Sequence, residues 1–91
     1  MEPLVISEKM VSTFKFWSNG QIQDGMNCRN EIFGCLRTAT LQGRQQIYDL
    51  GWTLSQKGIQ VVITVSDYKY TLWSNLRCLG QSESLLEQSV A

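Results

Sequence analysis

Aromatic and lysine side chains alternate along two separate segments of this chain, and together they could bind a partner. Lys15 and Trp17 share one side of the first segment, and Lys69 and Trp73 share one side of the second. Flat aromatic rings stack on nucleic-acid bases or bury area against another protein, and ammonium groups attract phosphate or carboxylate. If both segments are strands of one sheet together with residues 59–65, they form a surface that we call the aromatic–lysine face. Its residues are Lys15, Trp17, Val62, Thr64, Lys69, Thr71 and Trp73.

Three cysteines, Cys28, Cys35 and Cys78, could carry thiol chemistry. An odd count does not suit a closed disulfide framework, so reduced thiols in a cytoplasmic protein are the simplest interpretation. There is no histidine and no C-x-x-C pair, so a zinc site lacks ligands, and the sequence predicts no metal and no cofactor. Arg29 and Arg37 lie near the first two thiols and could favour the reactive thiolate. A thiol-dependent redox protein is therefore our third hypothesis, although buried cysteine is the commoner case.

Other routes to catalysis find little support in the sequence. Without histidine the chain lacks the usual neutral-pH base and the usual partner of a nucleophilic Ser or Cys. The acidic residues are scattered, with no pair spaced for shared acid–base work. Gly20 and Gly25 have the spacing of a phosphate loop, but Met26 stands where such a loop needs lysine. The sequence predicts a protein that is not an enzyme.

Charge and hydropathy exclude further classes. The 91 residues carry 8 Lys+Arg and 8 Asp+Glu, a net charge of zero, and 43% are hydrophobic. This balance argues against a protein whose main task is to neutralise phosphates. No stretch approaches the roughly 20 apolar residues that span a bilayer, and the N-terminus lacks the basic start of a signal peptide. We therefore expect a cytoplasmic protein with no membrane partner.

The first of the elements that must position these residues is a strand. Residues 10–18 alternate with a period of two and are rich in aromatic residues and Thr, which predicts a strand that presents Lys15 and Trp17 on one side. Asn19 and Gly20 are a strong turn signal that ends it. The polar residues that follow, as far as Gly25, predict a loop.

Residues 27–57 change to a helical period. Apolar residues recur three to four positions apart, at Cys28, Ile32, Leu36, Ala39, Ile47, Leu50 and Leu54. One long helix fits this series, and so do two helices broken near residues 40–43. The half from 44 to 57 is better supported, because Lys57 suits the helix dipole and Gly58 can supply a left-handed cap. For residues 31–41 the pattern leaves a strand open as the alternative.

Residues 59–65 and 68–73 are rich in β-branched and aromatic types and predict a β-hairpin that turns at Ser66 and Asp67. A two-residue turn there sets the cross-strand pairs Val65 with Tyr68, Ile63 with Tyr70, and Val61 with Leu72. One apolar set then shares a face, and the aromatic–lysine face lies opposite.

These elements predict an α+β fold of order β-α(α)-β-β, with a three-stranded mixed sheet and helix packed on one face. The helical segment is long enough for a right-handed crossover that makes the first two strands parallel neighbours. We expect a flexible N-terminal segment over residues 1–9, a single domain over 10–80, and a polar C-terminal tail over 81–91 that frays or docks as a short helix.

A three-stranded sheet of this size has exposed edges and a thin interior, and both problems favour a homodimer. The sequence therefore predicts a small non-catalytic cytoplasmic adaptor or regulator that acts through protein–protein contacts, using the aromatic–lysine face. The alternative is a module that binds single-stranded nucleic acid with the same face.

Overall fold

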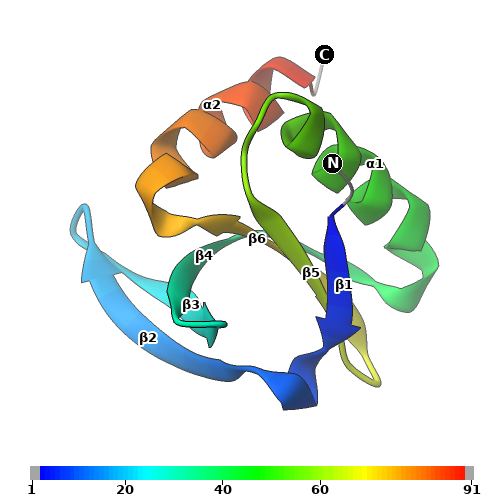
Figure 1. The fold of residues 1–91 in the computed structure, drawn as a ribbon, viewed down its shortest axis with the longest axis horizontal. Helices are drawn as coiled ribbons and strands as arrows, with labels where there is room; N and C mark the ends of the chain where they lie inside the picture. The colour runs from blue at the N-terminus through cyan, green and yellow to red at the C-terminus, as the bar shows by residue number, and fades with distance from the viewer. Residues whose placement is uncertain (1–2, 90–91) are drawn as a thin grey trace.

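The computed structural model describes residues 3–89, with side chains up to residue 86. It is an α+β fold of one six-stranded mixed sheet and two α-helices (Figure 1). The strands are β1 (Leu4–Ser7), β2 (Ser12–Ser18), β3 (Gln21–Cys28), β4 (Glu31–Thr40), β5 (Val61–Val65) and β6 (Lys69–Asn75). The helices are α1 (Arg44–Gln56) and α2 (Leu79–Ser89), with short 3₁₀ helices η1 (Glu8–Met10), η2 (Leu41–Gly43) and η3 (Leu76–Cys78).

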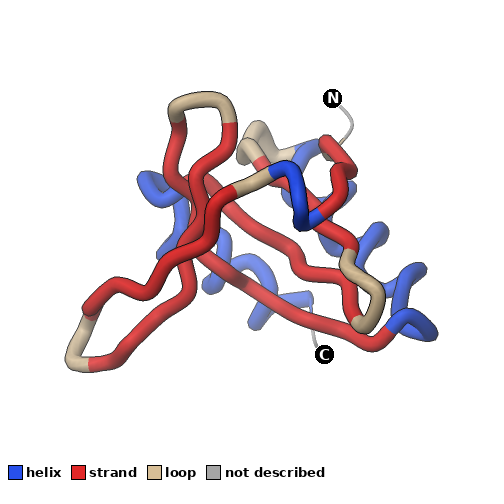
Figure 2. Tube along the Cα trace, turned by 90° about the horizontal axis from the view of Figure 1, so that it is seen from below, coloured by secondary structure: helices blue, strands red, loops and turns tan. Residues whose placement is uncertain are grey.

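The sheet runs in the order β1-β5-β6-β4-β3-β2 and curls strongly, so that it has a concave and a convex side (Figures 1 and 2). Only β1 and β5 are parallel neighbours, and all other pairs are antiparallel. The expected three-stranded sheet is therefore wrong in strand number. The expected parallel pairing of the first predicted strand is also wrong, because that strand, β2, lies at the far edge and pairs with β3.

Both α-helices pack on the convex side of the sheet (Figure 1). The core between helices and sheet consists of Leu36, Ile47, Leu54, Ile59, Val61, Ile63, Leu72 and Leu86. Helix α1 begins and ends almost where the sequence predicts, and Gly58 has the expected left-handed conformation, with φ +82°. Its backbone N–H donates to the carbonyl of Ser55, which completes the C-terminal cap.

Strand β4 occupies the first half of the segment with a helical period, so the strand alternative is the correct one. A β-bulge between Cys35 and Arg37 explains the misleading pattern. The extra residue lets Leu36 and Ala39, three positions apart, both pack against the convex core. Cys35 and Thr38, also three apart, both line the concave side. One inserted residue in a strand thus imitates the spacing of a helix.

Strand β3 replaces the predicted polar loop. Its sequence, QIQDGMNC, is poor in strand-forming residues, and its pairing with β2 and β4 holds it in the sheet. Tight two-residue turns join these strands: Asn19 and Gly20 have φ values of 52° and 74°, and Arg29 and Asn30 have 52° and 66°. Positive φ at both positions is the type I′ geometry that matches the twist of a hairpin.

The hairpin of β5 and β6 is confirmed, but its register is shifted by two residues. Val65 pairs with Tyr70 and Ile63 with Leu72. The cause is Ser66, whose hydroxyl accepts hydrogen bonds from the backbone N–H groups of Tyr68 and Lys69 and so moves the turn one residue along. A shift of two preserves the facing of every side chain, because the period of a strand is two.

The ends of the described chain are both built into the fold. Leu4–Ser7 forms the edge strand β1, which pairs with β5, in the region where we expect a flexible segment. The region of the expected polar tail belongs mostly to α2, the docked-helix alternative, with Leu86 buried on the convex core. Residues 1–2 and 90–91, the outer parts of the two predicted segments, lie outside the described residues.

Candidate functional site

The aromatic–lysine face lies on the concave side of the curled sheet, and much of it is covered. We expect an open face, but Val62 is buried and Trp73 is only 3% exposed. They form a second core with Met26, Cys28 and Phe33, and the N-terminal segment covers it through Leu4, Ile6 and Val11. This part of the face is therefore not open, because curvature of the sheet and the N-terminal segment turn it into the interior.

Trp73 and Thr64 meet each other inside this core. The indole Nε1–H of Trp73 donates a hydrogen bond of 2.9 Å to the hydroxyl of Thr64, whose side chain is buried. A buried indole N–H needs such an acceptor, so this pair satisfies the polar atom of the largest side chain in the concave core. Two residues of the aromatic–lysine face therefore stabilise the fold.

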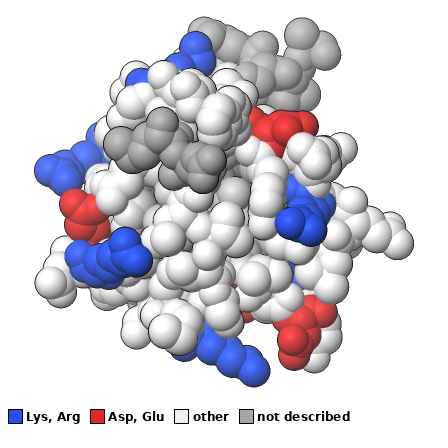
Figure 3. Space-filling view, turned by 45° about the vertical axis from the view of Figure 1, so that its right-hand side comes forward, with Lys and Arg blue, Asp and Glu red and all other residues white. Residues whose placement is uncertain are grey.

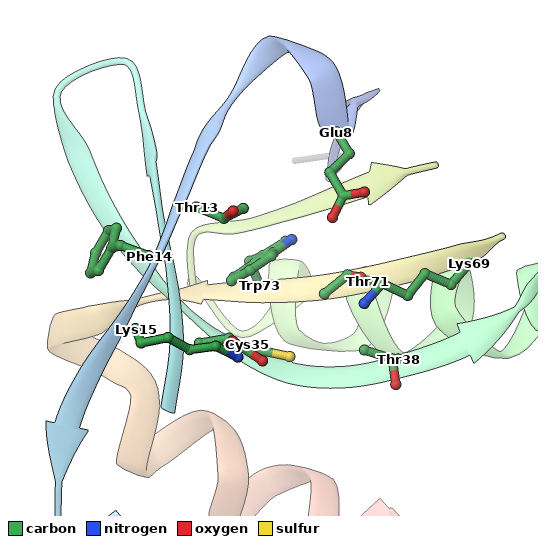
Figure 4. A pocket seen from close by; sticks show the side chains of 10 residues that line it. Glu8, Thr13, Phe14, Lys15, Cys35, Thr38, Lys69, Thr71 and Trp73 are labelled. Carbon is green, nitrogen blue, oxygen red and sulfur yellow. Dashed lines mark hydrogen bonds and ion pairs between the residues drawn. The ribbon is translucent and has the colours of Figure 1, made fainter. Parts of the chain in front are cut away.

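Three other members of the face, together with Trp73, gather around a hollow of about 320 Å³ at the open side of the curl, shown in Figure 4. Its lining is Glu8, Thr13, Phe14, Lys15, Asp24, Cys35, Thr38, Lys69, Thr71 and Trp73. Lys15, Lys69, Thr71 and Trp73 were expected to lie together, and they do. Of the others, Thr13 and Phe14 lie on β2, which the sequence predicted as a strand. The rest come from η1, β3 and β4, for which sequence patterns predicted a flexible segment, a loop and a helix. Only the strand alternative for residues 31–41 contained a signal for Cys35 and Thr38.

The charges in the hollow fall into a paired and an unpaired set. Lys15 and Asp24 are directly opposite each other on β2 and β3 and form an ion pair. Glu8 extends from η1 toward the hollow, and the side chain of Lys69 runs along β6 toward Thr71 (Figure 4). Among the residues that the structure describes, neither Glu8 nor Lys69 forms an ion pair. The hollow thus has one free acid and one free cation.

Cys35 is the only thiol in the lining of the hollow, and its environment opposes ionisation. Burial raises the pKa of the Cys35 thiol, and the nearby Asp24 carboxylate raises it further. Lys69, Lys15 and Arg37 act in the opposite direction but do not outweigh burial. The thiol is therefore protonated at neutral pH, which weakens the case for a nucleophile. Cys28 and Cys35 both fall in the segment predicted as helix, and that prediction is wrong for them because they lie on β3 and β4.

Trp17, the remaining member of the face, lies away from the hollow. It is 70% exposed and sits near the tip of the β2–β3 hairpin, which projects from the rest of the molecule (Figure 2). Its direct cross-strand partner is Ile22, which is 66% exposed. Directly opposite residues of an antiparallel pair share one side of the sheet. Two large apolar side chains are therefore displayed together on a protruding hairpin.

On the face of the molecule in Figure 3, charges of the two signs are mixed: Lys and Arg side chains are separated from one another, with Asp and Glu side chains among them. Within residues 3–89, no group of three or more His, Cys, Asp or Glu side chains is placed to hold a metal ion. In the same part of the chain, neither helix has the length and apolar character to cross a membrane. All three cysteines are free thiols.

Comparison of the chain with models of protein families, with curated proteins and with solved structures gives no match in any of the three. The function is therefore argued from the geometry of the chain itself.

Proposed function

We propose that this chain is a small non-catalytic cytoplasmic protein, an adaptor or regulator that acts through protein–protein contact as a homodimer. The observation that carries the proposal is the Trp17–Ile22 pair, exposed on a hairpin whose outer strand, β2, is an edge of the sheet. Exposed edge strands present unpaired backbone groups that another strand can complete, and exposed large apolar side chains favour such a contact. The contact surface is therefore smaller than the aromatic–lysine face and centred on β2.

The occupant that fits β2 best is a second copy of β2. When the seven-residue strand pairs antiparallel with its own copy over its full length, Lys15 lies at the centre. Thr13 then faces Trp17 of the other copy, and Phe14 faces Phe16 of the other copy. Two lysines meet at the centre, but each is neutralised by its own Asp24, which reduces the repulsion between them. The proposed register therefore pairs apolar side chains and leaves only a reduced repulsion at its centre.

The chemistry of the chain supports a binding role over the alternatives. The absence of histidine and the raised pKa of the Cys35 thiol argue against catalysis by a nucleophile. Burial of Trp73 removes one of the two aromatic platforms that single-stranded nucleic acid would need. Free thiols support the cytoplasmic location that we propose.

Charge substitutions on β2 test both the dimer and its register. Light scattering of the wild-type protein should give twice the chain mass of 10.4 kDa. The double variant Thr13→Glu with Trp17→Glu places like charges opposite each other in the proposed pairing and should be monomeric. The double variant Thr13→Glu with Trp17→Lys places opposite charges there and should restore the dimer. Both positions are exposed, so the monomer keeps its fold.

Trp52→Glu is the matched control, because Trp52 is another exposed Trp, on α1. It should leave the dimer mass unchanged. A wild-type monomer at all concentrations contradicts the proposal. If both double variants are dimeric, β2 is not the contact.

A further inference from the structure

The hollow on the concave side has more polar groups than the fold uses. The core beside it is closed by the Trp73–Thr64 hydrogen bond, and Lys15 is satisfied by Asp24. Glu8 and Lys69 take no part in either interaction. The proposed contact along the outer edge of β2 does not employ them. A cavity of about 320 Å³ with unused polar groups has the size and character of a small-molecule site, whose volumes are roughly 300–1,000 Å³.

The hydroxyl of Thr71 is an independent sign that the hollow is built to bind. Thr71 is only 3% exposed, yet its side chain makes no hydrogen bond to any described residue. Every fully enclosed side-chain oxygen or nitrogen in the described residues has a partner. The Thr71 hydroxyl therefore keeps its small accessible area, and Thr71 lines the hollow. A nearly buried hydroxyl without a protein partner is costly unless water or a ligand supplies the missing bond.

The arrangement of charge defines what such a ligand would carry. The free ammonium of Lys69 lies on the floor of the hollow beside Thr71, and the free carboxylate of Glu8 enters from the opposite wall (Figure 4). Lys69 would attract an anionic group, while Glu8 would attract a cationic one. The ring of Trp73 adds apolar surface to the lining. A molecule with both charges a short distance apart matches both walls.

We propose that the hollow is a binding site for a small zwitterion, namely a free amino acid. Its carboxylate binds the Lys69 ammonium and accepts a hydrogen bond from the Thr71 hydroxyl, and its ammonium group binds the Glu8 carboxylate. The hollow shares Thr13, Phe14 and Lys15 of β2 with the proposed dimer contact, but the groups that bind the zwitterion lie on η1 and β6.

A simple anion such as phosphate fits the hollow less well. Of its two lysines, Lys15 is already neutralised by Asp24, and the Glu8 carboxylate repels a second negative charge. The four charged groups of the lining, two lysines and two acids, sum to zero. Net neutrality with separated charges favours a zwitterion over an ion of either sign.

Nuclear magnetic resonance titration of the full chain tests the proposal. The proteinogenic amino acids are added singly, up to about 10 mM, well above the millimolar range of weak ligands. At least one should give saturable shifts in the Trp73 indole N–H and the Thr71 amide, and none in the indole signals of Trp17 and Trp52. The α-amide of that amino acid lacks the carboxylate and its N-acetyl derivative lacks the ammonium, so neither should bind. Inorganic phosphate at equal ionic strength should not shift these signals.

Single substitutions then assign the two charged walls. Lys69→Met and Glu8→Gln should each weaken binding by about tenfold or more, as expected for loss of one charge-assisted contact. The matched controls Lys57→Met and Glu83→Gln remove exposed charges outside the hollow and should leave the affinity unchanged. Because Lys69 is exposed, Glu8 is only partly buried and neither forms an ion pair with a described residue, their variants should keep the wild-type spectrum elsewhere.

Three results overturn the proposal. The first is that no amino acid gives a saturable shift. The second is that phosphate or the amide binds as well as the zwitterion. The third is that the Lys69 and Glu8 variants bind like their controls.

Discussion

Trp73 and Thr64 were candidates for a binding surface, but their hydrogen bond to each other makes them part of the core. In the sequence, both residues belong to a candidate binding face, since strand alternation places them together. In the structure, the indole N–H and the hydroxyl satisfy each other in the concave core. The contribution of this hydrogen bond to the free energy of unfolding can therefore be measured against Thr71, a neighbouring threonine whose hydroxyl makes no hydrogen bond to the described residues.

Thr64→Val should lower the free energy of unfolding by about 1–3 kcal/mol, because it leaves the buried Trp73 N–H without an acceptor. Thr71→Val is the matched control on the adjacent strand, and it should not destabilise the protein, because the nearly buried Thr71 hydroxyl makes no hydrogen bond to the described residues. Urea unfolding of both variants gives the two values. Equal losses would show that the Trp73–Thr64 bond contributes nothing specific.

The pH dependence of thiol labelling should identify the environment of Cys35. Because burial and Asp24 raise the pKa of this thiol, its labelling rate should rise only at a pH above the ordinary cysteine range. Asp24→Asn removes a carboxylate that raises the pKa, so it should shift the midpoint of the pH profile to lower pH. Mass spectrometry of the Cys35 peptide measures this midpoint.

Asp67→Asn, at the tip of the β5–β6 hairpin, is the control and should leave the Cys35 midpoint unchanged. The midpoint, and not the absolute rate, is the informative quantity, since partial burial slows labelling at every pH. A midpoint below the ordinary range would revive the hypothesis of a reactive thiol.

At the scale of elements, α2 makes the C-terminal region part of the core. Leu86 is fully buried, and the Ser82 hydroxyl is 2.6 Å from the Ser74 hydroxyl of β6. Leu86→Ala should lower the free energy of unfolding by about 2–5 kcal/mol, the range for a large-to-small change in a packed core. Ser84→Ala on the exposed side of α2 should change it by no more than about 0.5 kcal/mol. Thermal or urea unfolding measures both changes. A negligible effect of both substitutions would show that this region is a frayed tail.

Two glycines should respond to the same substitution with opposite signs. Gly80 lies on the exposed side of α2 with open space around it, so Gly80→Ala should stabilise the protein by up to about 1 kcal/mol. Gly58 caps α1 with φ +82°, where a Cβ is strained, so Gly58→Ala should destabilise it by about 1 kcal/mol. The difference between the two melting temperatures measures the effect.

At the scale of the whole molecule, the curled sheet carries a core on each of its sides, and the two cores differ in their covering. The convex core is closed by two helices, while the concave core is closed by β1, β3 and the link between β1 and β2. Strand β2 buries no residue completely, whereas β5 and β6 bury most of theirs. Burial is therefore concentrated at the centre of the sheet, whereas β2 at its edge is only partly buried.

Hydrogen exchange should follow this division. The amides of β5 and β6 should open only with global unfolding, and those of β2 should exchange much faster. If β2 pairs with a second copy, its protection should increase with protein concentration, while the protection of β5 and β6 stays constant. Concentration-independent exchange in β2 would contradict the proposed dimer contact.

Local sequence signals predicted those elements whose own residues decide the structure. The aromatic alternation of β2, the Asn19–Gly20 turn, α1 with its Gly58 cap, and the β5–β6 hairpin are each confirmed. In each of them, side-chain period and turn chemistry act over a few neighbouring residues. The shift of register at Ser66 was missed because it depends on one side chain that accepts backbone hydrogen bonds.

Elements that owe their structure to neighbours were not predictable in this way. Strand β3 has weak propensity and is held by two partners, β4 imitates a helix because of its bulge, and β1 is only a short edge strand on β5. Half of the sheet therefore depends on pairing across long sequence separations. The types and spacing of a few neighbouring residues do not determine such pairing.

From the sequence alone come the α+β class, the residue types around the candidate site, and a charge balance that disfavours phosphate binding. Which side of the sheet is open, and which of those residues meet, was decided by tertiary structure. Curvature of a six-stranded sheet turned an expected outer face into an inner core and a hollow, and it separated Trp17 from the rest of that face, beside Ile22 on the projecting hairpin. The physical reason is that curvature arises from strand number, twist and a bulge acting together, whereas the alternation of side chains is a property of each strand by itself.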